Sequence, residues 1–268
     1  MIDYSGKTVV ITGGATGIGF GFAKQLGGEG ASVLIGDPSS EKLAKASGIL
    51  NDLGIDASSF VMDVSDPGSV EAFADFAWET QGGVDLLINN AGIAIERKAM
   101  PEVDLTELRR LFDVNFFGVW HGAAVFGKRM IETGTPAAIY NVASENAFFN
   151  AVTKSAPYIA SKHAVRGLTE AMRDDFPDFI TVGMIVPGLV ASEMTKGLER
   201  YSLNADTFAA RAIEQMRDGE FYVVTHGYNI ERIKPIHAAI EDAYARNAPR
   251  EEGDEQYDVQ LLIKRLRG

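Results

Sequence analysis

The stretch that decides the expected fold is Thr12-Gly13-Gly14-Ala15-Thr16-Gly17-Ile18-Gly19. It follows a β-branched run at residues 7–11 that predicts a buried strand, and it precedes a helical pattern that begins at Phe20. Glycines at a strand-to-helix corner allow a tight turn and let bare backbone approach a bulky anion. The first N–H groups and the positive dipole end of the helix face the same place. The corner is therefore predicted to cradle a pyrophosphate, and a glycine-rich turn without a ligand is the alternative.

A second predicted strand favours the first of these alternatives. Residues 32–36 form an apolar run at the distance expected of a strand–helix–strand unit, and the run ends at Asp37. Asp37 follows Gly19 at close to the interval of ~20 residues at which an acidic side chain binds the adenosine ribose of a dinucleotide. This context predicts a dinucleotide site. An aspartate that only caps the next helix is the alternative for Asp37 itself.

Composition limits the class of protein. The chain has 268 residues, of which 46% are hydrophobic, enough for one doubly wound α/β domain with a sizeable core. The absence of cysteine excludes disulfides, zinc–thiolate sites and cysteine nucleophiles, and no metal site is predicted. No secretory signal is recognised and no apolar run is long enough to span a bilayer, so a cytoplasmic location is expected. The net charge of −12 disfavours nucleic acid and anionic membrane as partners.

Strand and helix signals alternate along most of the chain, as expected of a parallel sheet covered on both faces. Seven strands are predicted, the later five at residues 57–62, 85–88, 137–142, 180–186 and 221–225. Residues 1–228 are therefore expected to form one Rossmann-fold domain, with lid helices between residues 191 and 210. Residues 229–268 are expected to be a helical and acidic extension of that domain. Its amphipathic end, residues 259–266, is either a frayed tail or a docking arm for a neighbouring subunit.

The candidate reactive group lies at the start of a predicted helix. Tyr158 and Lys162 are four residues apart and therefore share one helix face. A phenol with a pKa of ~10 is a poor base at neutral pH, and a neighbouring ammonium lowers that pKa. Ser144 follows the predicted strand at 137–142, and ligands of such sheets bind beyond the carboxyl ends of the strands. The three side chains are therefore expected to meet at one edge of the sheet.

Four motifs, taken together and in chain order, resemble the short-chain dehydrogenase/reductase family. They are the T-G-x-x-x-G-x-G turn, N-N-A-G at residues 89–92, Y-x-x-x-K at 158–162 and P-G-x-V at 187–190. The resemblance implies a seven-stranded parallel Rossmann sheet and an oxidoreductase that transfers a hydride between nicotinamide and a secondary alcohol or ketone. Reduction of another double bond, such as an imine or enone, and a non-catalytic dinucleotide-binding regulator are the alternatives.

The resemblance also implies roles for individual residues. Tyr158 is expected to exchange the hydroxyl proton, Lys162 to lower the pKa of Tyr158, and Ser144 to position the substrate oxygen. Ser144 precedes Tyr158 by one residue more than is common in the family, and the common spacing would fall on Glu145. Asn115, in an apolar helical stretch, is expected to complete a proton relay. A satisfied buried amide is the alternative for Asn115.

The expected cofactor is NAD rather than NADP, because Asp37 would repel a 2′-phosphate and neither Pro38 nor the glycine turn supplies a cation. The expected cofactor-binding residues are Gly13, Thr16, Gly17, Ile18, Gly19, Asp37, Asp63, Val64, Asn90, Ala91, Gly92, Tyr158, Lys162, Pro187, Gly188, Val190 and Ser192. An apolar pocket predicts a small-molecule substrate that is bulky and hydrophobic, either aryl or steroid-like. The expected walls of that pocket are Ile95, Phe148, Phe149, Met194 and Leu198. Family members are commonly homo-oligomers, so a tetramer or a dimer is expected.

Overall fold

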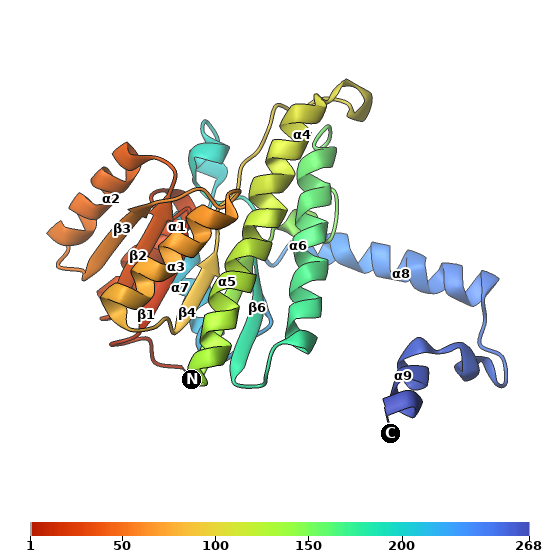
Figure 1. Ribbon diagram of the computed structural model, residues 1–268. Coiled ribbons are helices and arrows are strands. Elements are labelled where there is room, and N and C mark those ends of the chain that lie inside the picture. The colour runs from red at the N-terminus through yellow and green to blue at the C-terminus, as the bar shows by residue number, and fades with distance from the viewer. Residues whose placement is uncertain (1, 268) are drawn as a thin grey trace. The chain divides into compact units, whose positions relative to one another are not determined.

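The computed structural model describes residues 2–267, and the chain divides into two compact units, Met1–Gly227 and Tyr228–Gly268. Within its described residues, the first unit contains one seven-stranded parallel sheet with the strand order β3-β2-β1-β4-β5-β6-β7 (Figure 1). The predicted doubly wound sheet is therefore confirmed. The strands are β1 (Thr8–Thr12), β2 (Ser32–Asp37), β3 (Ala57–Val61), β4 (Leu86–Asn89), β5 (Ala137–Val142), β6 (Ile180–Val186) and β7 (Tyr222–Val224).

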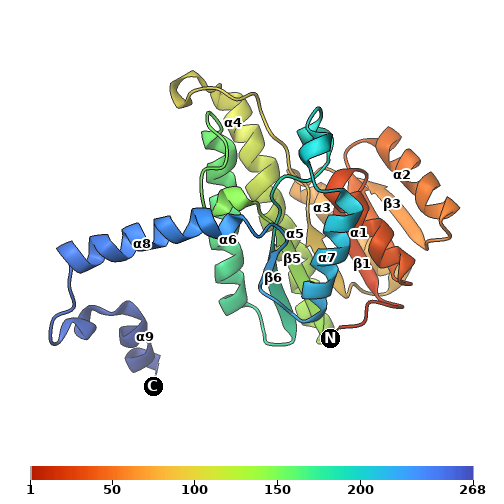
Figure 2. The same cartoon turned by 180° about the vertical axis from the view of Figure 1, so that it is seen from behind.

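Helices cover both faces of this sheet, as the two opposite views in Figures 1 and 2 show. One hydrophobic core lies between the strands and α1 (Gly17–Gly28), α2 (Ser40–Asp52) and α7 (Ala205–Arg217). The second core lies between the strands and α3 (Pro67–Gln81), α5 (Gly118–Thr133) and α6 (Ala156–Asp175).

The central strand β1 shows why the sheet is buried on both sides. Val9 and Ile11 belong to the first core and Val10 to the second, and all three side chains are fully buried. Successive side chains of a strand point to opposite faces, so a run of apolar residues without polar alternation fits only a strand with two covered faces. β1 pairs with β2 on one side and β4 on the other, and chain order reverses between β1 and β4. Ligands of doubly wound sheets bind at such a switch point.

Local sequence signals mark both ends of α3. The carboxylate of Asp66 accepts a hydrogen bond from the backbone N–H of Gly68 at 2.9 Å and caps α3, which has Pro67 in its first turn. The same helix ends at Gly82, whose φ of +77° is the left-handed conformation of a glycine cap. These contacts lie within a few residues of one another, which is why the sequence alone predicts them.

The segment between β6 and α7 differs from the prediction of lid helices over residues 191–210. It forms two short 3₁₀ turns, η4 (Glu193–Thr195) and η5 (Glu199–Tyr201), before α7 begins at Ala205. α7 itself packs on the sheet beside α1, where Phe22 and Phe208 meet edge to face with ring centres 6.1 Å apart. Only the 3₁₀ turns, and not α7, are therefore in a position to serve as a lid.

The second unit is helical, as predicted. It contains α8 (Asn229–Asn247), a 3₁₀ turn η6 (Asp254–Tyr257) and α9 (Val259–Arg267). An ion pair between Arg246 and Asp242 spans one turn of α8 at 2.7 Å. None of the helices in residues 2–267 is both long and apolar enough to cross a bilayer.

Candidate active site

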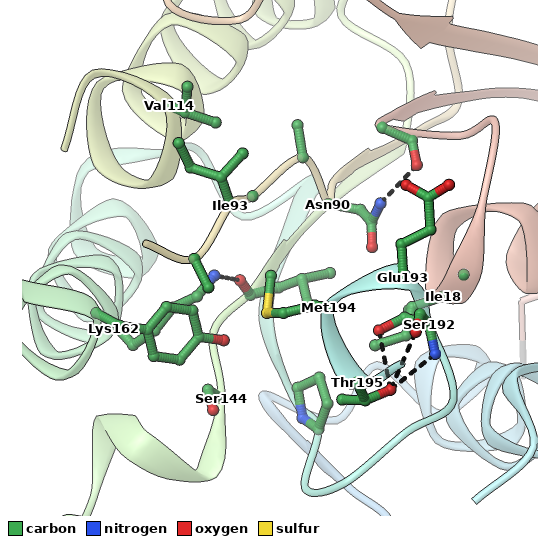
Figure 3. A pocket seen from close by; sticks show the side chains of 18 of the residues that line it. Ile18, Asn90, Ile93, Val114, Ser144, Lys162, Ser192, Glu193, Met194 and Thr195 are labelled. Carbon is green, nitrogen blue, oxygen red and sulfur yellow. Dashed lines mark hydrogen bonds between the residues drawn. The ribbon is translucent and has the colours of Figure 1, made fainter. Parts of the chain in front are cut away.

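A cavity of about 850 Å³ opens beyond the carboxyl ends of the strands. In Figure 3, Ser144 and Lys162 lie on one side of it, and Ile18 and Ser192 lie on the other. The predicted site residues that line this cavity are Gly13, Thr16, Gly17, Ile18, Asp37, Asp63, Val64, Asn90, Ala91, Gly92, Ile95, Ser144, Tyr158, Lys162, Pro187, Gly188, Val190, Ser192, Met194 and Leu198. The predicted residues that lie outside its lining are Gly19, Asn115, Phe148 and Phe149.

The glycine corner between β1 and α1 needs glycine for geometric reasons. Gly13 and Gly17 have φ angles of +61° and +56°, which L side chains rarely adopt. A Cβ on Gly13 would lie 2.9 Å from the Cα of Ala91 on the neighbouring strand end. No side chain among the described residues caps the start of α1 at Thr16. The corner therefore presents bare backbone and uncapped N–H groups to the cavity, which fits a phosphate-bearing ligand.

Gly19 lies where the first turn of α1 packs closely against the glycine corner. A Cβ there would lie 2.4 Å from the backbone oxygen of Gly13 and 2.5 Å from Nδ2 of Asn90. Gly19 therefore permits close packing of α1 against the turn.

The end of β1 is fastened to the end of β4 by hydrogen bonds. Thr12 Oγ1 accepts from the backbone N–H groups of Asn90 and Ala91 at 3.0 and 3.1 Å. Asn90 Nδ2 donates in return to the carbonyls of Thr12 and Gly13 at 2.9 and 3.0 Å. These hydrogen bonds join the turn after β4, which carries the N-N-A-G motif, to the glycine corner after β1.

The acid predicted at the end of β2 lies at one end of the cavity. Asp37 is 9% exposed, and its Oδ1 accepts from the backbone N–H of Ser39 at 3.0 Å. Its Oδ2 has no partner among the described residues, so it remains able to accept from a ligand hydroxyl. Lys42 also lines this end, but its ammonium pairs with Glu193 at 2.5 Å. Sequence reasoning missed this ion pair, because its partners are far apart in the chain.

Tyr158 and Lys162 lie on α6 and both line the cavity. Lys162 is only 4% exposed, and burial lowers its pKa to about 8. Its Nζ donates to the carbonyl of Val142 at 2.9 Å and lies 5.7 Å from the ring centre of Tyr158. Burial also raises the pKa of the Tyr158 phenol, and a hydrogen bond with Ser144 works in the opposite direction. The negative charge of Glu145 adds a smaller upward effect on the same pKa.

The structure distinguishes Ser144 from Glu145, the two residues left by the spacing argument. Ser144 is 6% exposed at the end of β5, and its hydroxyl lowers the pKa of the Tyr158 phenol. Glu145 begins the 3₁₀ turn η3 (Glu145–Ala147) and also lines the cavity. Ser144 is therefore the hydroxyl that lies within reach of the phenol.

Asn115 is fully buried beside the cavity, not in its wall. The apolar helical stretch that contains Asn115 is interrupted by a π turn, Asp113–Phe117, between α4 (Leu105–Phe112) and α5. The side-chain amide of Asn115 accepts from the N–H of Ile93 at 2.8 Å and donates to the Ile93 carbonyl at 3.0 Å. Both polar ends are thus satisfied, and π turns shift backbone carbonyls out of the helical pattern.

Phe148 does not form the predicted pocket wall. Its ring packs edge to face against Tyr222 with centres 6.0 Å apart, and the guanidinium of Arg166 lies 4.5 Å from the ring centre. Because the turn η3 aims this side chain toward α6 and β7, the aromatic surface joins a small core instead of the cavity. Phe149, next along the chain, is likewise absent from the lining. Val114 and Met194, shown together in Figure 3, are apolar side chains that line the cavity.

A residue that none of the sequence motifs includes contacts the turn after β6. His226, beyond β7, accepts a hydrogen bond at Nδ1 from the backbone N–H of Gly188 at 3.2 Å. Burial lowers the pKa of His226, which favours the neutral ring that can accept at Nδ1. Nearby, Thr195 Oγ1 donates to the carbonyl of Val190 at 2.8 Å and accepts from the N–H of Ser192 at 2.9 Å. These bonds hold the turn and the start of η4 along the cavity.

Comparison with known proteins places this geometry in a family. The family model described as short chain dehydrogenase matches residues 7–202. The chain belongs to the short-chain dehydrogenase family. Members of this family are oxidoreductases that use nicotinamide cofactors. The family assignment agrees with the resemblance that the four sequence motifs indicate.

Several relatives of this short-chain dehydrogenase have described activities or structures. It is 33% identical over 230 residues to a 1-deoxy-11-beta-hydroxypentalenate dehydrogenase of Streptomyces avermitilis, covering 82% of this chain and 84% of the relative. It is 36% identical over 192 residues to a 3-alpha-(or 20-beta)-hydroxysteroid dehydrogenase of Mycobacterium bovis, covering 71% of each. A short chain dehydrogenase/reductase from Burkholderia phymatum, solved in complex with NAD, superposes with a TM-score of 0.86 at 26% identity, covering 94% of this chain and 99% of that one. LigO from Sphingobium sp. strain SYK-6 gives 0.85 at 28% identity, with 99% and 98% covered.

Proposed function

We propose that this protein is an NAD-dependent oxidoreductase that transfers a hydride between nicotinamide and a secondary alcohol or ketone. The observation that carries the proposal is a single cavity that joins the glycine corner and Asp37 at one end to Ser144, Tyr158 and Lys162 at the other. A dinucleotide laid along this cavity would bring its nicotinamide beside the phenol. NAD, when bound, supplies the hydride acceptor and, as NADH, the donor.

The residues of this chain would then handle the proton and the position of the substrate. In oxidation, the Tyr158 phenolate accepts the hydroxyl proton while Ser144 donates a hydrogen bond to the same oxygen. The Lys162 ammonium favours the phenolate, which burial alone disfavours. In reduction, the Tyr158 phenol returns the proton to the carbonyl oxygen. Asn115 would act from behind the cavity wall, where its π turn presents displaced carbonyls to a proton relay.

NAD is preferred over NADP because of the charges at the adenosine end of the cavity. Within residues 2–267, only Oδ1 of Asp37 accepts a hydrogen bond, from Ser39, so the carboxylate can accept further bonds from ribose hydroxyls, and its charge repels a 2′-phosphate. Lys42, a cation in the lining, is already paired with Glu193. The neighbour from Burkholderia phymatum, which was solved with NAD, supports the same choice.

The substrate is proposed to be a bulky hydrophobic alcohol or ketone. Ile95, Met194 and Leu198 line the cavity, and Met194 and Leu198 are 48% and 45% exposed, which leaves apolar surface for a ligand to cover. The names of the hydroxypentalenate and hydroxysteroid dehydrogenases indicate polycyclic substrates of this kind for those relatives. The protein is also proposed to form a homo-oligomer, either a dimer or a tetramer, and analytical ultracentrifugation tests this.

A direct spectrophotometric assay tests the reaction. Purified protein is incubated with NAD or NADP and a panel of cyclic, aryl and steroid alcohols, and reduced cofactor is followed by its absorbance. Product identification separates carbonyl formation from the imine and enone alternatives. Tyr158→Phe should lose turnover by at least about 10²-fold, the lower scale of general acid–base catalysis, while its affinity for NADH stays within about twofold. Full activity of that variant would disprove the role of the phenol. NADH binding without turnover of any substrate would favour the regulator.

A further inference from the structure

The hydroxyl of Ser144 is held by a second residue that no motif includes. Asn146, in the turn η3, is 6% exposed and lines the cavity. Ser144 Oγ accepts from the backbone N–H of Asn146 at 3.1 Å and from Asn146 Nδ2 at 3.3 Å. Both acceptor positions of the hydroxyl are therefore used, and only its own proton is left to form a further bond.

The orientation of the Asn146 amide is itself fixed by the backbone. Its Oδ1 accepts from the N–H of Ala151 at 3.1 Å. An N–H can only donate, so the amide oxygen must face Ala151 and the amide nitrogen must face Ser144. The direction of the two bonds, from Ala151 to Asn146 and from Asn146 to Ser144, is thus set by a main-chain N–H that can only donate.

We propose that Asn146 is a positioning residue that forces the Ser144 hydroxyl to donate toward Tyr158 and the substrate oxygen. This inference rests on the proposed function, because it concerns the hydroxyl that the function assigns to substrate binding. A hydroxyl that could also accept would spend part of its time with the proton turned away. With both acceptor positions filled, the donor is preorganised before the substrate arrives, and preorganised donors contribute about 10²–10³-fold to kcat in comparable oxyanion sites.

The sharpest test is Asn146→Asp, which keeps the size of the side chain and reverses its bonding to Ser144. One carboxylate oxygen would still accept from Ala151, and the other would accept the proton of Ser144 and withdraw it from the cavity. The matched control is Asn150→Asp, which adds the same charge to the same loop at an exposed position outside the main cavity. We expect Asn146→Asp to lower kcat by 10-fold or more with less than a threefold change in KM for NAD, and the control to change kcat less than twofold.

A double-mutant cycle separates positioning from simple damage to the turn. In a Ser144→Ala background the hydroxyl is gone, so Asn146→Asp should lower the residual kcat by less than about twofold. An equal loss in both backgrounds, or wild-type kcat in the single variant, would overturn the proposal. The acid limb of the pH–rate profile should also move to higher pH in Asn146→Asp, more than in Asn150→Asp.

A measurement without substrate keeps this inference apart from the proposed function. The ultraviolet absorbance of phenolate is recorded against pH for each protein and for the same protein with Tyr158→Phe. The difference between the two curves reports the titration of Tyr158 alone. Asn146→Asp should raise the pH at which Tyr158 ionises by more than Asn150→Asp does, whether or not an alcohol substrate is known. If wild-type protein turns over no alcohol, the proposed function fails. If Tyr158 titrates alike in the two aspartate variants, the positioning role fails.

Discussion

Replacing Lys162 by methionine should make the protein more stable while it destroys catalysis. The ammonium is 4% exposed, and burial lowers its pKa from 10.5 to about 8. Because one pKa unit corresponds to ~1.4 kcal/mol, keeping this group charged at pH 7 costs about 3 kcal/mol of folding free energy. The variant also loses the hydrogen bond to the Val142 carbonyl, worth ~1 kcal/mol. The net gain should be about 2 kcal/mol, or roughly 4–8 °C in Tm.

The difference in stability between Lys162→Met and the wild type should depend on pH, and the two pKa values set its direction. Below pH 8 the lysine is protonated in both the folded and the unfolded protein, so the wild type bears the whole penalty. Between pH 8 and 10.5 the folded wild type releases the proton while the unfolded chain keeps it, so the stability of the wild type rises with pH. The advantage of Lys162→Met should therefore be greatest at pH 7 and fall below ~1 kcal/mol near pH 9.5.

Urea unfolding followed by circular dichroism, without cofactor, measures both values. The control is Lys128→Met, at an exposed position of α5, which should change the free energy of unfolding by less than ~0.5 kcal/mol at either pH. The reasoning fails if Lys162→Met is no more stable than wild type at pH 7. It also fails if the difference between the two proteins is the same at pH 7 and pH 9.5. A stability gain with loss of turnover would show that the active site holds its cation at a cost to folding.

Three further outcomes are expected. Asp37→Ser removes the charge that opposes a 2′-phosphate, so the ratio of kcat/KM with NADP to that with NAD should rise at least about tenfold, and an unchanged ratio would count against the adenosine end assigned here. Gly13→Ala places a Cβ 2.9 Å from the Cα of Ala91 at a φ of +61°. The free energy of unfolding should therefore fall by about 1–3 kcal/mol in thermal unfolding, and the affinity for NADH should also fall. The control Gly28→Ala, which has open space around it, should change neither quantity. Because burial raises the pKa of Tyr158, kcat/KM for alcohol oxidation should increase with pH from 6 to 8, and a flat profile would mean that another group takes the proton.

Much of the site follows from residue spacing alone. The strands at Ala137–Val142 and Ile180–Val186 have the predicted bounds, because their apolar runs end in polar or turn residues that no longer fit a covered sheet. Tyr158 and Lys162 share one face of α6 because a helix repeats every 3.6 residues, whatever surrounds it. Parallel strands deliver their carboxyl ends to one edge, so residues that follow successive strands must gather there.

Other features could be learned only from the tertiary structure. The choice of Ser144 over Glu145 depends on how the turn after β5 meets α6, and the same turn sends Phe148 into a core against Tyr222. In the π turn, Asn115 accepts a hydrogen bond from the backbone N–H of Ile93, a partner far away in sequence.

The sequence by itself therefore determined the fold, the family and the faces on which reactive groups lie, because periodicity and spacing are local properties of a chain. Tertiary structure alone decided which atoms of those groups meet. A hydrogen bond such as that from Asn146 Nδ2 to Ser144 Oγ depends on distances and angles within a few tenths of an ångström. Packing between distant segments sets those distances, and residue order does not encode them in any local pattern.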